Sequence, residues 1–230
     1  TTVQSWTTTY VATCEGKNSP AYPLNVYWIP PYTENGIIYD DNGTPTVLNF
    51  ENEKLTAADL NTLSGESDTV TIAGTTVDRD KILSVGLYEL DPSVDAIPDN
   101  FLYGFTNLIY IDSTNASMSQ IKTIGKYFLH YCRSITEVDV SVFTGLDMAD
   151  SIGQGAFNCC DSLVNINIGS IYSMAFDADD GYYYYSFATD NNEAPCYVTG
   201  ITLTGEHAAD VKTRFPEYSS RWGIYRAWAA

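Results

Sequence analysis

The sequence predicts a β-rich fold with short helices, in which about three turns of 27–28 residues form a solenoid behind a non-repeating N-terminal module. The first observation is an internal repeat. Residues 97–105, 124–132 and 152–160 are related in sequence and begin 27 and 28 residues apart. The second is the alternation of apolar and polar residues after each segment, which is typical of a strand. Because one turn of a solenoid cannot bury its apolar side alone, we expect the repeated positions to stack into one core.

The apolar positions after each segment place the strands. Counted from Phe105, Cys132 and Cys160, the residues at +3 are Leu108, Ile135 and Leu163, those at +6 are Ile111, Val138 and Ile166, and those at +8 are Ser113, Val140 and Ile168. We therefore expect short parallel strands around residues 110–113, 137–140 and 165–168. A short helical turn is expected in the Phe-Leu-x-x-Cys stretch before each strand.

The repeat is interrupted near the C-terminus by an Asp-rich and Tyr-rich insertion between Ile168 and Ile201. The strand pattern returns at residues 201–203. Residues 206–215 then alternate like a short helix that Pro216 stops. We expect this helix to cap the solenoid, because a terminal turn needs a polar outer face.

Residues 1–80 do not repeat, but they carry strand and turn signals. Residues 7–12, 26–29, 36–39 and 46–50 are rich in β-branched and aromatic side chains, and Asn35-Gly36 and Asn42-Gly43 are turn signals. We expect a hairpin over residues 37–50 and a short helix over residues 56–63 with Thr56 as its N-cap. The chain is thus divided into a β-rich attachment module (1–80), the solenoid (81–205) and a C-terminal capping helix and tail (206–230).

Composition limits the partners of this chain. A net charge of −18 and a pI near 4.1 repel phosphate backbones and anionic lipid, so we expect no nucleic-acid partner. No apolar run is long enough to predict insertion into a membrane. The chain begins Thr1-Thr2, which fits either removal of an initiator Met or a processed form. The five cysteines include no C-x-x-C pair, and we expect mostly free, buried thiols.

Two repeats resemble a known family. "TIGKYFLHYCRSITEVDV" and "SIGQGAFNCCDSLVNINI" look like the bacterial surface-antigen (BspA-like) leucine-rich repeats, whose pattern is about I-G-x-x-A/F-F-x-x-C-x-S-L-x-x-I-x-I. The closing "YVTGITLTGEHAADVKTRFPEYSSRWGIYR" resembles the terminal strand and helix of versions found in gut phages. The resemblance covers about residues 82–215 and implies a leucine-rich-repeat solenoid. Phe105 departs from the pattern, because it stands where the other repeats have Cys.

The resemblance implies a non-enzymatic structural or adhesion protein displayed on a surface. The leading hypothesis is a bacteriophage virion component, such as a capsid decoration, a head fibre or a tail-associated protein, located at the virion surface. Its partners would be other structural proteins of the assembly and a host glycan or surface protein. A secreted or wall-attached bacterial adhesin of the same family, extracellular or on the cell surface, is the first alternative. A carbohydrate-active enzyme with an acidic cleft is the second.

Two sets of residues are candidate binding sites. The exposed positions of the repeat strands form two columns, since equivalent positions recur along a stack. The columns contain Tyr110, Glu137 and Asn165, and Asp112, Asp139 and Asn167. The second set is an aromatic loop suited to an interface, made of Tyr182, Tyr183, Tyr184, Tyr185 and Phe187. Each set has a simpler reading, a solvated polar face for the columns and a cover over the end of the solenoid for the loop.

No catalytic residue, cofactor or metal site is predicted. His130 lies inside a repeat and His207 on the expected capping helix, and neither stands in a nucleophile or zinc motif. The acidic run at residues 177–180 lacks the twelve-residue loop and closing Glu of a calcium-binding hand.

Overall fold

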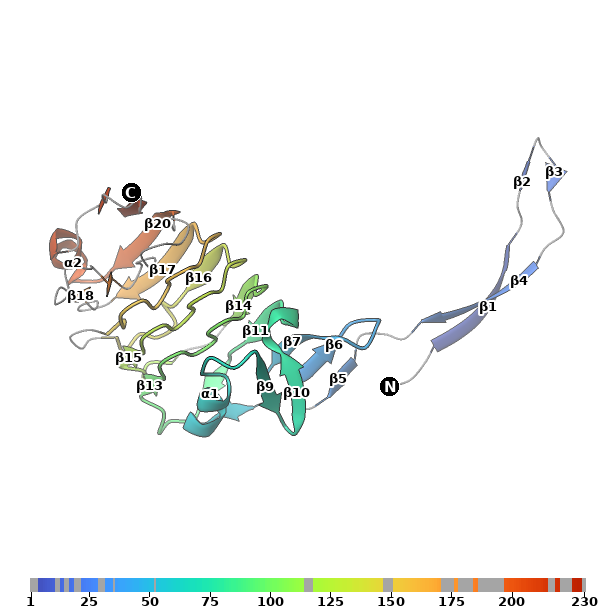
Figure 1. The fold of residues 1–230 in the computed structure, drawn as a ribbon, viewed down its shortest axis with the longest axis horizontal. Helices are drawn as coiled ribbons and strands as arrows, with labels where there is room; N and C mark the ends of the chain where they lie inside the picture. Colours follow the sequence, from blue (N-terminus) through green and yellow to red (C-terminus); the bar gives the residue numbers. More distant parts are fainter. Residues whose placement is uncertain are drawn as a thin grey trace.

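The computed structural model is β-rich with few short helices, which confirms the predicted class (Figure 1). It describes residues 4–10, 13–14, 17–18, 22–28, 32–34, 36–51, 53–113, 118–146, 151–170, 176–177, 184–185, 197–214, 218–219 and 225–228. Side chains are described at residues 36–51, 53–113, 118–146, 151–170, 200–210 and 213. Within this part of the chain, no helix combines the length and the apolar character that crossing a bilayer requires.

The first of two five-stranded sheets combines a hairpin with two later strands. In spatial order it contains β14 (Tyr110–Asp112), β11 (Ser84–Gly86), β7 (Pro45–Asn49), β6 (Ile37–Tyr39) and β5 (Tyr32–Glu34). β5, β6 and β7 are antiparallel, whereas β7, β11 and β14 are parallel. The hairpin predicted over residues 37–50 is confirmed. Its turn is held by Asp40, whose Oδ1 accepts hydrogen bonds from the backbone N–H of Asn42 and Thr44.

The second sheet contains the later repeats. Its order is β16 (Glu137–Asp139), β17 (Asn165–Ser170), β20 (Tyr197–Thr204), β22 (Tyr225–Trp228) and β21 (Tyr218–Ser219). β16, β17, β20 and β22 are parallel, and Val138, Ile166 and Ile201 are aligned across the first three. The strands predicted around residues 110–113, 137–140, 165–168 and 201–203 are therefore present, with bounds that differ by a few residues.

The remaining strands form short pairs. They are β1 (Gln4–Tyr10) with β4 (Tyr22–Trp28), β2 (Thr13–Cys14) with β3 (Lys17–Asn18), β9 (Thr69–Ile72) with β10 (Thr75–Asp78), β8 (Lys54–Leu55) with β12 (Glu89–Leu90), β13 (Ala96–Ile97) with β15 (Thr123–Ile124), and β18 (Phe176–Asp177) with β19 (Tyr184–Tyr185). β1 and β4, which overlap the predicted segments 7–12 and 26–29, extend away from the two five-stranded sheets in Figure 1.

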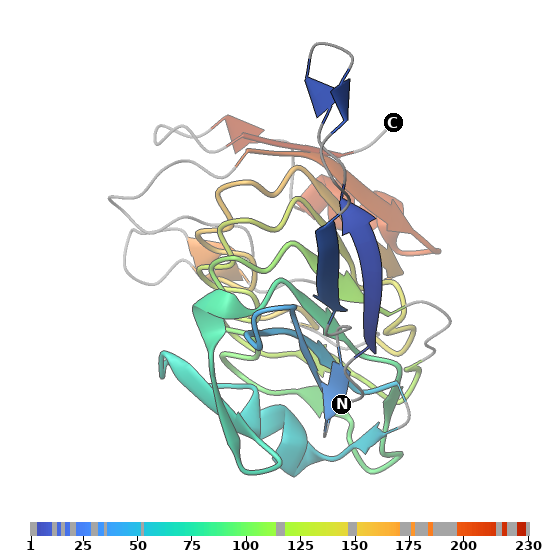
Figure 2. The same ribbon diagram turned by 90° about the vertical axis from the view of Figure 1, so that its right-hand side faces the viewer.

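The repeated segments lie next to one another in parallel register. Ile97 pairs with Ile124 in β13 and β15, and Ile124 forms a single bridge to Ile152. Figure 2 shows the successive segments one above another, from green through yellow to orange. Rings of successive repeats are also in contact. The centroid of Phe128 lies 5.8 Å from that of Phe101 at the equivalent position, and 6.0 Å from that of Phe157, which is one position further along its repeat. We call this parallel arrangement of residues 84–204 the stack.

The predicted helical turn before each strand is wrong. The segments at 98–105, 125–132 and 153–160 are hydrogen-bonded turns rather than helices. Tyr127 (φ 55°), Tyr131 (φ 63°) and Cys159 (φ 57°) have the left-handed backbone conformation. A right-handed helix cannot continue through such residues, so each segment bends sharply and returns the chain to the next strand.

The helices elsewhere match expectation. α1 (Ala57–Thr62) begins after Thr56, whose hydroxyl accepts a hydrogen bond from the Asp59 N–H while Asp59 accepts from the Thr56 N–H, a capping box. The 3₁₀-helix η1 (Arg79–Lys81) lies where the module was expected to join the repeats. α2 (Ala208–Arg214) falls within the predicted residues 206–215, and Ala208 packs on the hydrophobic core.

The hydrophobic core crosses the predicted boundary at residue 80. One cluster of buried side chains extends from Ile37 to Leu203. β7, from the N-terminal side of the boundary, pairs over residues 47–49 with β11 from the other side, with Leu48 opposite Val85. Residues 36–80 therefore pack with the stack, while the division into three parts stays a prediction.

Candidate functional site

Four of the six predicted column residues are brought together in the second sheet. Asn165 stands opposite Glu137 and Asn167 stands opposite Asp139. The Asn165 side-chain amide donates to Oε1 of Glu137 at 3.2 Å, and the Asn167 amide donates to Oδ2 of Asp139 at 3.2 Å. The carboxylates of one strand are thus bound by the amides of the next, which makes two polar ladders across β16 and β17.

The other two column residues lie in the first sheet. Asp112 accepts a hydrogen bond of 2.7 Å from the Tyr88 hydroxyl. Burial, this hydrogen bond and the charge of Asp112 raise the pKa of Tyr88 to about 12. Tyr110 is exposed on β14, in register with Ser84. β14 and β16 end their respective sheets, so the predicted columns are divided between two sheets.

The polar side chains on the exposed face of β16 and β17 are held in place before any partner binds. Oδ1 of Asp139 accepts from both the N–H and the hydroxyl of Ser141, at 2.9 Å and 2.5 Å, in addition to its bond from Asn167. A carboxylate held by several donors keeps its orientation. Such a surface presents fixed negative charge to a partner without having to reorganise.

Sequence reasoning missed an apolar feature beside these columns. Leu83, Ile109, Tyr110 and Val164 are 41%, 53%, 50% and 43% exposed, and they are the exposed large hydrophobic residues among the described side chains. We call these four residues the apolar strip. Ile109 and Val164 directly precede the strands of their repeats, at position +4 counted from Phe105 and Cys160. The predicted column residues are at positions +5 and +7 in the same count. The sequence contains a signal for this feature. The core positions are +3, +6 and +8, so burial in the core does not explain an apolar residue at +4.

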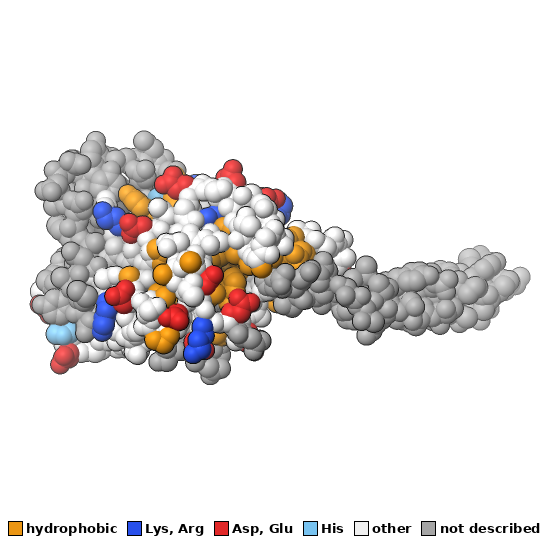
Figure 3. All heavy atoms as spheres, turned by 90° about the horizontal axis from the view of Figure 1, so that it is seen from below, with side chains coloured by type: hydrophobic (Ala, Val, Ile, Leu, Met, Phe, Trp, Pro, Cys, Tyr) orange, Lys and Arg blue, Asp and Glu red, His pale blue; other side chains and the backbone are white. Residues whose placement is uncertain are grey.

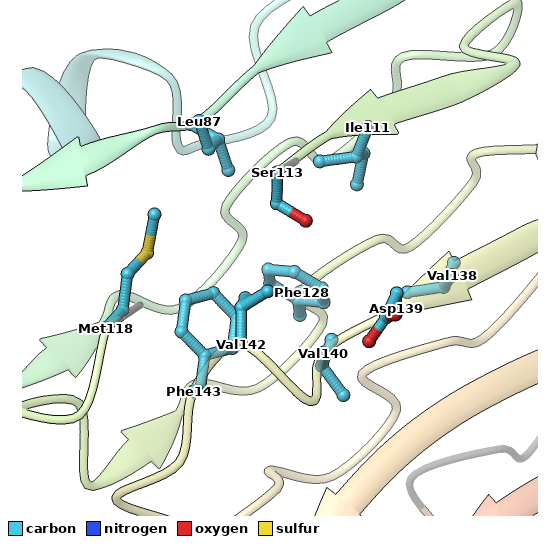
Figure 4. A pocket seen from close by; sticks show the side chains of 10 residues that line it. All are labelled: Leu87, Ile111, Ser113, Met118, Phe128, Val138, Asp139, Val140, Val142 and Phe143. Atoms are coloured by element: carbon cyan, nitrogen blue, oxygen red, sulfur yellow. The ribbon is translucent and has the colours of Figure 1, made fainter. Parts of the chain in front are cut away.

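A small cavity lies where the two five-stranded sheets meet (Figure 4). Its volume is about 10 Å³, room for about one water molecule. The lining residues are Leu87, Ile111, Ser113, Met118, Phe128, Val138, Asp139, Val140, Val142 and Phe143. Ser113 occupies the position that Val140 and Ile168 occupy in the other repeats, so the cavity coincides with a missing aliphatic side chain.

Replacing Ser113 with Val should fill this cavity and raise the free energy of unfolding by about 1 kcal/mol, since it adds buried methyl groups at an under-packed position. Chemical denaturation of both proteins measures the difference. Ser119→Val at an exposed position is the matched control and should change stability by less than about 0.5 kcal/mol. A Ser113→Val protein no more stable than the wild type would contradict this account of the cavity.

Three cysteines, at positions 132, 159 and 160, are buried thiols that form no disulfide, as expected. The Cys132 thiol donates to the Leu102 carbonyl at 3.2 Å, and the Cys160 thiol donates to the Leu129 carbonyl at 3.1 Å. Burial raises the pKa of the Cys132 thiol. In each case a repeat Cys bonds to the backbone of the preceding repeat, so these thiols hold neighbouring segments together.

These thiols should resist a disulfide reagent in the native protein, because only an exposed thiolate attacks a disulfide. With Cys14 and Cys196 replaced by Ser, we expect reaction with Ellman's reagent at least about 100-fold slower in buffer than in denaturing guanidinium. The measurement is the change in absorbance with time. Fast reaction of all three thiols under native conditions would show that these segments open readily.

The histidines have different surroundings. His130 is 7% exposed and stacks on Tyr103, with centroids 5.1 Å apart and planes at 5°, while Tyr127 and Tyr131 contact it edge to face. His207 is partly exposed, and its Nε2 lies 3.5 Å from a carboxylate oxygen of Glu206. His130 therefore belongs to an aromatic cluster on the turns.

Other predicted features lie outside the described side chains. Of the aromatic loop, the structure gives only the backbone of Tyr184 and Tyr185, in β19. Tyr182, Tyr183 and Phe187, together with most of the acidic run at 177–180, lie outside the described residues. Among the side chains that are described, no group of three or more His, Cys, Asp or Glu is arranged to hold a metal ion.

Comparison with protein-family models, with curated proteins and with solved structures gave no match. The candidate site is therefore defined by geometry alone: two polar ladders, Tyr110 and Asp112 on the neighbouring sheet, and the apolar strip. On the face seen in Figure 3, acidic and basic side chains are scattered among polar and hydrophobic ones.

Proposed function

We propose that residues 81–205 are a leucine-rich-repeat solenoid of the BspA-like type, closed by α2, and that the chain is a non-enzymatic binding protein displayed on a surface. The parallel pairing of segments 28 residues apart, such as Glu137 with Asn165, supports the solenoid. The buried Cys and Phe positions support it as well, because they recur in contact from one repeat to the next.

The main support for a binding role is the kind of side chain exposed on the repeat strands, which we call the strand face. Its polar side chains are held by one another, as Asp139 is by Asn167 and Ser141, so they need no rearrangement to meet a partner. Beside them Ile109 and Val164 expose about half of their side chains to water. Exposed apolar residues next to polar ones are typical of an interaction surface.

The resemblance to repeats of gut-phage proteins supports a particular setting, a structural component of a bacteriophage virion. In this proposal the N-terminal module, including β1 and β4, docks to the particle, and the strand face points outward to a host glycan or surface protein. The capsid decoration, the head fibre and the tail-associated protein share this arrangement and differ in where the module docks.

Mass spectrometry of purified phage particles and of the host surface fraction from the same culture tests this setting. We expect peptides of the chain in particles at tens to hundreds of copies, about the copy number of a repeated surface component. Peptides found only in the cell-surface fraction would overturn the virion setting and support the bacterial adhesin.

A further inference from the structure

The apolar strip is divided between the two five-stranded sheets, with Leu83, Ile109 and Tyr110 at β11 and β14 and with Val164 at β17. The backbone N–H of Leu83 donates to the Thr46 carbonyl at 2.8 Å, and that of Ile109 donates to the Leu83 carbonyl at 2.8 Å. In the second sheet the N–H of Val164 donates to the Thr136 carbonyl at 2.9 Å. Leu83 and Ile109 therefore stand on neighbouring positions of the first sheet, whereas Thr136 holds the equivalent position between Ile109 and Val164.

Charge borders the strip on one side. Glu137 and Asp139 are exposed acids in the adjoining columns, and their hydrogen-bond donors, Asn165 and Asn167, are uncharged amides that leave the negative charge in place. The cations Lys81 and Arg133 form ion pairs with Asp80 and Asp161 of this chain, at 2.9 Å and 2.6 Å. The strip is therefore an apolar line with a net acidic border.

This border selects the charge of the partner. A second copy of the chain would bring the same acidic border, and the net charge of −18 would repel it over the whole approach. A partner with Lys or Arg beside its apolar side chains would meet opposite charge at the border and apolar surface at the strip.

Spacing selects the shape of the partner. Neighbouring strands are about 4.8 Å apart, and side chains on one face of a crossing strand recur only every 6.6 Å or so. The turns of an α-helix recur about every 5.4 Å, which is closer to the spacing of the strip. A helix lying along the stack can therefore place one apolar side chain near Leu83, one near Ile109 and, after a turn that passes Thr136, one near Val164.

We infer that the apolar strip is the docking surface for a cationic amphipathic helix of another protein, which lies across the strands with its apolar stripe on Leu83, Ile109, Tyr110 and Val164 and its Lys or Arg residues over Glu137 and Asp139. This inference rests on the proposed binding function and names the chemistry of the partner.

The test uses the full chain and a labelled probe peptide. The probe is an Ala-based peptide of about 14 residues, stapled into a helix because isolated helices of this length are marginal in water. It carries Leu at helical spacing on one stripe and Lys on the neighbouring stripe. Fluorescence anisotropy should give a Kd of about 10–100 µM, and a peptide with Glu in place of Lys should bind at least about tenfold more weakly.

Two variants locate the probe on the chain. Ile109→Ser combined with Val164→Ser should raise the Kd at least about tenfold, because it removes the exposed apolar contacts. Glu137→Gln keeps an oxygen acceptor for the Asn165 amide but removes the charge, and should weaken binding about two- to fivefold at low salt. Thr71→Ser combined with Thr76→Ser, exposed on β9 and β10, is the matched control and should bind as the wild type does.

Equal binding of the Lys and Glu peptides, or an unchanged Kd in the Ile109/Val164 variant, would overturn the inference. So would a wild-type dimer in sedimentation that the same two substitutions convert to a monomer, since the strip would then bind a second copy. None of these outcomes would contradict the proposed function if the chain is recovered from phage particles, because that recovery does not depend on binding of the probe peptide.

Discussion

Replacing Gly153 with Ala is expected to destabilise the protein by about 3 kcal/mol. A Cβ atom at this position would lie 2.6 Å from the carbonyl carbon of Gly125 and 2.6 Å from the backbone nitrogen of Lys126, in the preceding repeat. Because these are backbone atoms, the two repeats would have to separate to make room. A Cβ atom at Gly125 would likewise meet the backbone of Pro98 and Asp99 in the repeat before it. This close approach explains why Gly follows Ile in both repeats.

Thermal and chemical denaturation measure the effect, and Gly86→Ala is the matched control. A Cβ at Gly86 would meet only the ring end of Tyr88, the nearest atom at 2.7 Å, and that side chain can move away. We expect a loss of about 1 kcal/mol there. Equal losses at Gly86 and Gly153 would contradict the close backbone contact between repeats.

Replacing Arg79 with Met is expected to destabilise the protein by about 3 kcal/mol. The side chain is 2% exposed, and its guanidinium lies 4.9 Å from the centre of the Phe105 ring. Nη1 donates to the carbonyls of Leu63 and Tyr103 at 3.3 Å and 2.6 Å, and Nη2 donates to that of Ser64 at 2.9 Å. Met would remove the Arg79 donor from the Tyr103 and Ser64 carbonyls, whereas the Leu63 carbonyl would keep the backbone N–H of Leu102 as a donor.

The Arg79→Lys variant tests the charge of this side chain separately from the shape of its guanidinium group. Lys keeps the charge but cannot reach all three carbonyls with a single ammonium group, so we expect a loss of about 1–2 kcal/mol. Arg133→Met removes an exposed ion pair with Asp161 and a ring contact with Tyr131, and should cost less than about 1 kcal/mol. Burial lowers the pKa of Arg79 to about 10, so the guanidinium stays charged at neutral pH. We call Arg79 a clamp because it binds carbonyls of two separate segments. If Arg79→Met loses no more stability than Arg133→Met, this role is contradicted.

This clamp gives a physical reason for the departure at Phe105. In the later repeats, Cys132 and Cys160 donate to a carbonyl of the repeat before them. At the first repeat the neighbour is instead the segment after α1, where Leu63 and Ser64 are bound by Arg79. A Phe ring at this position packs against the guanidinium, which a thiol could not do.

The repeat pattern predicted the strands well because each one is defined by apolar residues that must be buried. Val138 and Ile166 are buried and aligned as their 28-residue spacing required, and Ile201, where the strand pattern returns after the insertion, is aligned with Ile166. Thr56 was identified as an N-cap from its residue type alone. Local chemistry of this kind can be read from a single sequence.

Other features depend on contacts that the sequence pattern does not encode. The left-handed conformations of Tyr127 and Tyr131 replaced the expected helical turns, and neither residue signals such a conformation by its type. The pairing of β7 with β11 could not be read from the period, because β7 precedes the repeats. The division of the columns between two sheets arises at β14 and β16, where Ser113 lines a cavity.

The most direct test of the account is to delete one complete repeat and measure unfolding. Removing residues 125–152 joins Ile124 to Gly153 and takes out 28 residues, one full period. If the repeats form a solenoid, the shortened chain should keep its β-rich circular dichroism and unfold cooperatively at a lower midpoint, because each repeat contacts only its neighbours. Removing residues 125–138, half a period, should abolish the fold. Loss of the fold in both deletions would contradict the solenoid on which the proposed function rests.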